Sequence, residues 1–367
     1  MNVIKARHPD PYTRTTPAAL GAKAQALKDA TGSNSDDEML LGLAELVSLV
    51  NDGHTLVTSV YTSFELASLR FAWFQDGFYA VEAPAELHAA LAGRRLTMIG
   101  GIPIDDVADD LAHLVPGETE IMAGTRVSEL LAYPAILAAR GFAADSENAQ
   151  YFFDGNSSPV VMAASLSPPV PVVSSVEHDL PMSFLDQDSY YWAGADPDRS
   201  LLYVQYNRCA EDPGYPFPEF VEDVIRIIER EPVDRVLIDL RNNSGGDSTA
   251  IEPLVSALSS SRLHAPGKVY VAIGPYTFSS AILNAKELQW RLDATLIGSS
   301  TGEWLNHFGE VKFRTLPNTH VRISYSTEHF LLAPDGDGPL IPDIELPYLG
   351  SDFTRGVDPV LDYFDTR

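Results

Sequence analysis

Short apolar runs rich in β-branched residues alternate with segments of helical periodicity from residue 201 onward. The predicted strands cover 201–206, 236–240, 268–273 and 294–297, and the predicted helices cover 219–228, 251–258 and 279–292. Alternating units of this length favour a largely parallel sheet covered by helices. The pattern therefore predicts an αβ sheet domain over 201–367.

The first half of the chain has a different pattern. An Ala/Leu/Lys repeat predicts a helix over 17–30, and Ser35 followed by acidic residues predicts the N-cap of a second helix. Strand-like alternation over 71–83 and 95–99 is followed by helical periodicity over 105–114 and 127–139. We expect an N-terminal helical region (1–65), an α+β module (66–165) and a weakly patterned connector (166–200). The predicted fold class is thus mixed α/β and α+β, in several domains.

Composition narrows the choice of partners. The 367 residues contain 25 Lys plus Arg against 51 Asp plus Glu, a net charge of −26. Such a field repels phosphate backbones and anionic lipid surfaces, so we expect neither nucleic acid nor a membrane as a partner. The single cysteine, Cys209, excludes an intramolecular disulfide and a cysteine-based zinc site. No signal peptide is evident in the chain as given, so a cytoplasmic location is the default expectation; an exported form with a removed signal stays open.

Two strand-end turns are the candidates for chemistry. The predicted strand at 236–240 runs into Asn242-Asn243-Ser244-Gly245-Gly246, and the strand at 268–273 runs into Thr277-Phe278-Ser279-Ser280. Tandem glycines allow backbone amides to approach a ligand, and a serine at a helix N-terminus lies in a field that favours an anion. Two such turns on neighbouring strands would form an oxyanion pocket. A simple helix cap by the serines is the competing interpretation.

Four blocks together resemble the tail-specific (C-terminal processing) serine peptidases. They are Asp239-Leu240-Arg241-Asn242-Asn243-Ser244-Gly245-Gly246, Thr277-Phe278-Ser279-Ser280-Ala281, Gly298-Ser299-Ser300-Thr301-Gly302 and Pro342-Asp343-Ile344. The resemblance implies a crotonase-like ββα arrangement for the sheet domain, and residues 96–107 are similar to the PDZ-like module of these enzymes. It also implies a peptide or protein substrate, with no metal and no organic cofactor.

Residue roles follow from that resemblance. Ser279 aligns with the nucleophile, and the oxyanion donors align with the backbone of Gly245, Gly246 and Ser280. One branch of the family uses a lysine base after the block at 298–302, but this chain has Gly302-Glu303-Trp304 there. Asn51-Asp52-Gly53-His54-Thr55 instead resembles the histidine block of the tricorn-like branch, which makes His54 the general base.

The remaining site candidates are less closely tied to a motif. Asp337 resembles the orienting carboxylate of the tricorn-like branch, and Asp335 and Glu310 are the alternatives. Tyr206, at a predicted strand end, and Asn306, in the segment after a glycine turn, are candidate substrate contacts. The chain is thus predicted to be a serine peptidase. Homo-oligomerisation is left open by the sequence. A non-catalytic binding protein for a peptide or an apolar ligand on the same scaffold is the alternative.

Overall fold

The chain forms two compact units. The computed structural model describes residues 1–367 apart from 85, 88–90, 92, 166–180, 335–337 and 366–367. Unit 1 comprises Met1–Glu177 and Asn306–Leu331, and unit 2 comprises His178–Leu305 and Leu332–Arg367. Each unit is therefore assembled from two separate stretches of the chain. The mixed α/β class with several sheets, predicted from the sequence, is confirmed.

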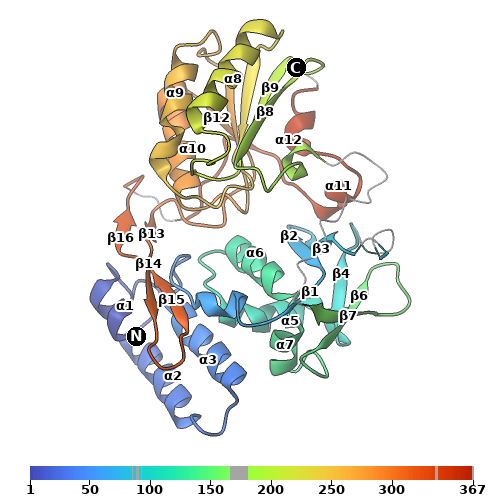
Figure 1. The fold of residues 1–367 in the computed structure, drawn as a ribbon, viewed down its shortest axis with the longest axis vertical. Coiled ribbons are helices and arrows are strands. Elements are labelled where there is room, and N and C mark those ends of the chain that lie inside the picture. The colour runs from blue at the N-terminus through green and yellow to red at the C-terminus, as the bar shows by residue number, and fades with distance from the viewer. Residues whose placement is uncertain (85, 88–90, 92, 166–180, 335–337, 366–367) are drawn as a thin grey trace. The chain divides into compact units, whose positions relative to one another are not determined.

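A six-stranded sheet in the order β17-β12-β11-β10-β9-β8 is the centre of unit 2 (Figure 1). Its strands are β8 (Tyr191–Asp196), β9 (Leu201–Tyr206), β10 (Arg235–Asp239), β11 (Val269–Ile273), β12 (Thr295–Gly298) and β17 (Ile344–Glu345). Neighbouring strands are parallel from β9 to β17, as the alternating pattern predicted. β8 pairs with β9 in the antiparallel direction.

Helices cover both faces of this sheet, which explains its almost uniformly apolar strands. They are α8 (Phe217–Arg230), α9 (Glu252–Ser259) and α10 (Ser280–Leu292) on one face, and α12 (Pro359–Asp362) on the other, with α11 (Gly350–Thr354) nearby in the chain. Phe220, Val224 and Ile228 recur on one side of α8 and pack into the core between that helix and the sheet. Val360 and Leu361 of α12 pack with Leu201, Tyr203 and Leu237 on the opposite face.

β8 lies inside the range predicted to be a connector. Its sequence, Tyr-Trp-Ala-Gly-Ala-Asp, has small residues in place of a clear alternation of apolar and polar side chains. Period-2 alternation is the signal by which a half-buried strand is recognised, and here it is weak. The strand exists because β9 offers it a complete ladder from Tyr191 to Asp196.

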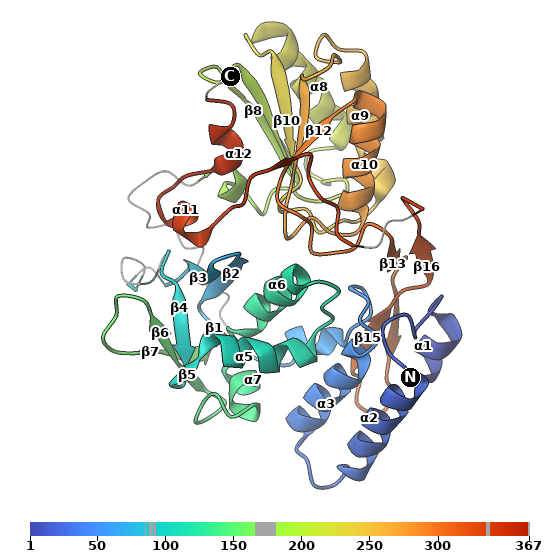
Figure 2. The same cartoon turned by 180° about the vertical axis from the view of Figure 1, so that it is seen from behind.

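Unit 1 combines a helical region with small sheets (Figure 2). Its helices are α1 (Asn2–Arg7), α2 (Pro17–Asp29), α3 (Asp36–Ser48), α5 (Ile104–Leu111), α6 (Glu120–Leu130) and α7 (Pro134–Ala139). α3 begins where the sequence predicted, because Ser35 accepts a bond from the Glu38 amide while the Glu38 carboxylate accepts one from the Ser35 amide. The predicted helix over 127–139 is instead two helices, since Pro134 lacks an amide hydrogen and starts α7.

The described strands of unit 1 form a five-stranded sheet and three two-stranded ones. They are β1 (Leu66–Ala67), β2 (Arg70–Phe74), β3 (Gly77–Glu82), β4 (Leu96–Ile99), β5 (Ile102–Pro103), β6 (Asn148–Phe153), β7 (Val160–Ser165), β13 (His307–Gly309), β14 (Lys312–Thr315), β15 (Arg322–Tyr325) and β16 (Glu328–Phe330). Val57 bridges Ile323 of β15, so the 306–331 stretch is tied into the N-terminal region. Across the described ranges, no helix has the length and apolar character needed to cross a membrane.

The packing of Phe364, which follows α12, leads to a prediction about stability. Phe364 is 1% exposed and meets the Tyr270 ring at 5.0 Å. Phe364→Ala should lower the free energy of unfolding by about 3–5 kcal/mol, because a buried aromatic ring is removed and a cavity remains. Thermal and urea unfolding of the purified chain would measure this loss. Phe313→Ala removes the same ring at a 50% exposed position and should cost no more than about 1 kcal/mol. Equal losses in the two variants would contradict the packing role of Phe364.

Candidate active site

Two turns lie side by side at the carboxyl ends of β10 and β11. The two strands are parallel neighbours, so both chains leave the sheet at the same edge. The Phe278 amide donates to the Asn243 carbonyl at 3.0 Å, and the Thr277 hydroxyl donates to the Leu240 carbonyl at 2.8 Å. The prediction that these strand ends are adjacent is therefore confirmed.

Ser279 is held in a backbone conformation that non-glycine residues rarely adopt. It precedes α10 with φ 57° and ψ −126°, and its side chain does not cap the helix. Its amide donates to Glu303 Oε2 at 2.6 Å, and its carbonyl accepts a bond from the Ile282 amide at 2.9 Å. Such strain costs about 1–3 kcal/mol and persists only where surrounding contacts enforce it. A serine on a strained strand-to-helix turn is the geometry in which a hydroxyl serves as a nucleophile.

The tandem glycines let the first turn approach the second. Gly245 has φ 95°, and a Cβ added there would lie 2.8 Å from Ser279 Cβ. Gly246 has φ 136°, and an added Cβ would lie 2.2 Å from the Cys209 carbonyl oxygen. Both positions thus require glycine for two reasons, the positive φ and the absence of space.

The amides around Ser279 are not equivalent. The Gly245 amide already donates to Asn243 Oδ1 at 2.8 Å, so an oxyanion at that position would have to replace this bond. Within the described part of the chain, the amides of Gly246 and Ser280 make no hydrogen bond. The Ser280 hydroxyl donates to the Gly246 carbonyl at 2.7 Å and links the two turns. Amides presented in this way can stabilise a negative oxygen.

Glu303 was not singled out as an active-site residue from the sequence. It is fully buried, and its backbone carbonyl accepts a bond from the Thr301 hydroxyl at 2.8 Å. The sequence offered only a subsite interpretation for the segment that contains it. The available signal was position: Glu303 follows β12, the next parallel strand, and parallel strands end at one edge of the sheet.

A buried ionic cluster supports the first turn from beneath. Arg241 donates to Asp239 Oδ2 at 2.6 Å and to Asp358 Oδ1 and Oδ2 at 2.8 Å each. Burial disfavours the charge, but the two carboxylates raise the pKa of Arg241 well above its ordinary value. The Tyr203 hydroxyl donates to Asp239 at 2.7 Å, which extends the network across β9. The start of the turn is thereby anchored to the strand and to the residue before α12.

His54 belongs to unit 1 and has its own buried network. It is 7% exposed, its amide donates to Asp52 Oδ1 at 3.0 Å, and its ring stacks on His307 at 6.3 Å between centroids. His8 Nε2 lies 3.0 Å from Asp52 Oδ2. Burial raises the pKa of Asp52, but hydrogen bonds from His8, Ser326 and Thr55 and the charge of His54 lower it overall. Asp52 is therefore a buried anion that organises the residues on either side of it.

The other predicted site residues are in varied surroundings. Tyr206 is fully buried, and its ring packs against Tyr191 and Phe217, so its side chain offers no surface to a substrate in this conformation. Asn306 is half-buried and is the first residue of the second stretch of unit 1. Glu310 forms an exposed ion pair with Lys312 at 2.6 Å. Asp335 and Asp337 lie outside the described residues. Across those described, no cluster of three His, Cys, Asp or Glu residues could hold a metal ion.

Comparisons with known proteins show the fold. No protein-family model matches the sequence, and no curated protein matches it either. Mature CPAF complexed with lactacystin matches with a TM-score of 0.72 at 14% identity, over 99% of this chain and 95% of that chain. Mature CPAF alone matches with a TM-score of 0.68 at 14% identity, over 99% and 94%. The photosystem II D1 C-terminal processing protease gives a TM-score of 0.44 at 12% identity, over 98% of this chain and 96% of that chain. The chain therefore shares the fold of CPAF.

The contact at Gly246 generates a second prediction. Gly246→Ala should lower the free energy of unfolding by more than about 3 kcal/mol, since backbone strain adds to a clash with the Cys209 carbonyl. Gly267→Ala is the matched control, because that glycine has φ 72° but nothing within 4 Å of an added Cβ. The control should lose only about 1 kcal/mol. Thermal unfolding of both variants measures the difference, and similar melting temperatures would show that the turn has room for a side chain.

Proposed function

We propose that this chain is a serine peptidase that hydrolyses peptide bonds through an acyl-enzyme on Ser279. The observation that carries the proposal is the strained Ser279, which is followed by the Ser280 amide and is closely approached by the Gly245 turn. An attacking serine needs its hydroxyl presented away from the sheet, and the tetrahedral intermediate needs amide donors close to the same atom. The shared fold with CPAF agrees with the tail-specific peptidase resemblance of the sequence blocks.

His54 is the proposed general base. A neutral imidazole can accept the Ser279 proton during attack and return it to the leaving amine. The buried Asp52 carboxylate supports this assignment, because it bonds the His54 amide and lies 3.9 Å from His54 Nδ1. A nearby anion stabilises the imidazolium that forms during the reaction. The sequence predicts Asp337 as the carboxylate that orients the histidine. The PDZ-like module and the crotonase-like arrangement of the sheet domain are likewise predictions from the sequence.

Glu303 is the proposed positioning residue for the nucleophile. Its carboxylate accepts the Ser279 amide, so it stabilises the backbone angle that exposes the hydroxyl. The carboxylate accepts a bond from the amide of the residue that carries the reacting hydroxyl. Glu303 therefore holds the turn in either protonation state of His54. Charge-assisted hydrogen bonds of this kind are stronger than neutral ones.

Fluorophosphonate labelling tests the nucleophile. We expect a covalent adduct at Ser279, located by peptide mass spectrometry, and its loss in Ser279→Ala together with a fall in peptide hydrolysis of at least about 10⁴-fold. His54→Gln should slow labelling and hydrolysis by about 10²–10⁴-fold, because the proton acceptor is lost.

Ser256→Ala, an exposed position on α9, is the matched control and should label like the parent chain. If the folded chain carries no adduct at Ser279, the peptidase proposal fails and the binding-protein alternative is favoured. An adduct that forms equally fast in His54→Gln would remove His54 from the mechanism and leave the nucleophile in place.

Two substitutions at Glu303 separate positioning from chemistry. Glu303→Gln keeps a side-chain oxygen that can accept the Ser279 amide, whereas Glu303→Ala removes it. We expect the alanine variant to lose about 10²-fold or more in labelling rate and the glutamine variant to retain most of it. Labelling reactions quenched at set times, at a fixed reagent concentration, give the labelling rates of both variants. Equal losses in the two variants would mean that the negative charge itself takes part in the reaction.

A further inference from the structure

The strand β8 lies at the edge of its sheet as far as the described residues show. It is the last strand in the sheet order, and among the described residues it pairs only with β9. An edge strand presents unpaired amides and carbonyls, which an added strand can satisfy. What matters for such an addition is which residues of β8 point outward.

Two hydrogen bonds determine that direction. The Asn207 amide donates to the Tyr190 carbonyl at 2.9 Å, which makes Tyr190 and Asn207 a hydrogen-bonded pair of the antiparallel ladder. In such a ladder, hydrogen-bonded and non-bonded pairs alternate. Independently, the Ser200 carbonyl accepts a bond from the Asp234 amide at 2.8 Å. Every second residue of β9, counted from Ser200, therefore directs its backbone amide and carbonyl toward β10, and the residues between them direct theirs toward β8. The two bonds lead to the same conclusion. The backbone amides and carbonyls of Tyr191, Ala193 and Ala195 point away from the sheet.

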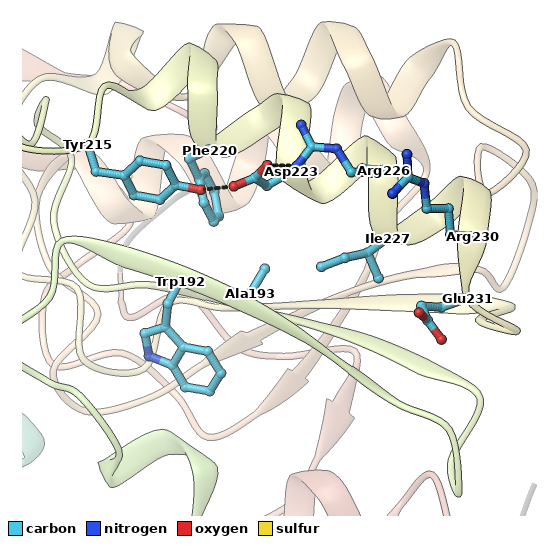
Figure 3. Close-up of a pocket in the computed structure, with 9 residues that line it drawn as sticks. All are labelled: Trp192, Ala193, Tyr215, Phe220, Asp223, Arg226, Ile227, Arg230 and Glu231. Carbon is cyan, nitrogen blue, oxygen red and sulfur yellow. Dashed lines mark hydrogen bonds and ion pairs between the residues drawn. The ribbon is translucent and has the colours of Figure 1, made fainter.

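A cavity lies between this edge and α8 (Figure 3). Its volume is about 460 Å³, and Ala193, Phe220 and Ile227 supply apolar lining. Figure 3 shows the Trp192 side chain on the other side of the strand, whereas Phe220 and Ile227 of α8 point toward the strand. The small side chain of Ala193 leaves this volume open directly beside an outward-facing amide and carbonyl. An apolar side chain of an added strand would therefore have a place to enter.

The rim of the cavity carries charge. The Tyr215 hydroxyl donates to Asp223 Oδ2 at 2.5 Å, and Arg226 pairs with the same carboxylate. Arg230, one turn further along α8, has no ion-pair partner within the described residues, in a chain whose net charge is −26. Glu231 lines the same end of the cavity (Figure 3), so a single carboxylate fits there better than a run of acidic residues.

We infer that β8 and α8 form a binding site for an extended peptide that adds to the sheet as a further strand. The peptide pairs its backbone with Ala193 and Ala195, places one apolar side chain in the cavity, and directs one carboxylate to Arg230. Backbone pairing supplies affinity in this mode of recognition, and the pocket with its charged rim supplies selectivity. β9 separates β8 from β10, so the site is distinct from the turns around Ser279.

A second copy of the chain fits this edge less well than a peptide. Two chains that each carry a net charge of −26 repel one another on approach. A short peptide with one carboxylate adds little to that repulsion and still satisfies Arg230. The inference does not depend on catalysis at Ser279.

The test uses the full chain and a C-terminally amidated seven-residue peptide of alternating Thr and Val, with a central Leu, a Glu at one end and a fluorophore of zero net charge. Fluorescence anisotropy should show saturable binding, and a central Pro should abolish it, because proline cannot donate to a ladder. Ala193→Leu fills the cavity and should weaken binding by about tenfold or more. Arg230→Gln should weaken it by about two- to fivefold, and only for the Glu peptide, not its Gln analogue. Arg314→Gln, an exposed arginine of unit 1, should leave binding unchanged.

Amide hydrogen exchange gives a second measurement that does not rely on substitutions. Peptide binding should slow exchange at Ala193 and Ala195 and leave Trp192 and Gly194 unchanged, because the latter already bond β9. No binding up to millimolar peptide, equal binding of the proline peptide, or uniform protection along β8 would each overturn the inference. So would a chain that elutes as a dimer and becomes a monomer in Ala193→Leu, since the occupant of the edge would then be a second copy.

Discussion

The arrangement of the candidate active site depends on one buried ionic cluster, Arg241 held between Asp239 and Asp358. Burying three charged groups is favourable only when every charge is paired and hydrogen-bonded, and losing one partner leaves an uncompensated charge at a cost of about 3–5 kcal/mol. The cluster joins the end of β10 to the residue that precedes α12. The turn that carries Gly245 and Gly246 therefore begins at a fixed position, and this restricts how the turn can move relative to Ser279.

From this anchor, the site is built by close contact between backbones. Gly245 touches the Ser279 turn, Gly246 touches the Cys209 carbonyl, and Asn243 accepts the Phe278 amide. Each contact restricts the position of the next, so the unfavourable φ of Ser279 is enforced from several sides. Backbone strain of this kind is common at functional sites, and a helix cap alone would not require it. The Glu303 carboxylate completes the enclosure from the next strand end.

The two units divide the proposed chemistry between them. Unit 2 contains the nucleophile and the amide donors, and unit 1 contains the histidine with its buried Asp52. Asp52 is bonded by groups from three separate stretches, represented by His8, Thr55 and Ser326, so the environment of His54 depends on how unit 1 folds as a whole. The binding edge inferred at β8 is separated from β11 by β10 and β9, and it rests on a different interaction, namely unpaired backbone groups beside a cavity.

Local pattern determined much of the fold. The alternation from 201 onward predicted β9 to β12 and their helices, because buried parallel strands and amphipathic helices carry distinct periodicities. The Ser35 cap and the adjacency of the Gly245 and Ser279 turns also follow from sequence alone, since they depend on neighbouring residues and sheet order. β8 could not be predicted, because Ala193, Gly194 and Ala195 have no periodicity and form a strand only against β9. Glu303 and Asp358 were likewise missed as partners of Ser279 and Arg241, 24 and 117 residues away along the chain. Only the tertiary structure decides such pairs. A buried amide or guanidinium needs a partner, and sequence spacing does not tell which distant carboxylate is buried beside it.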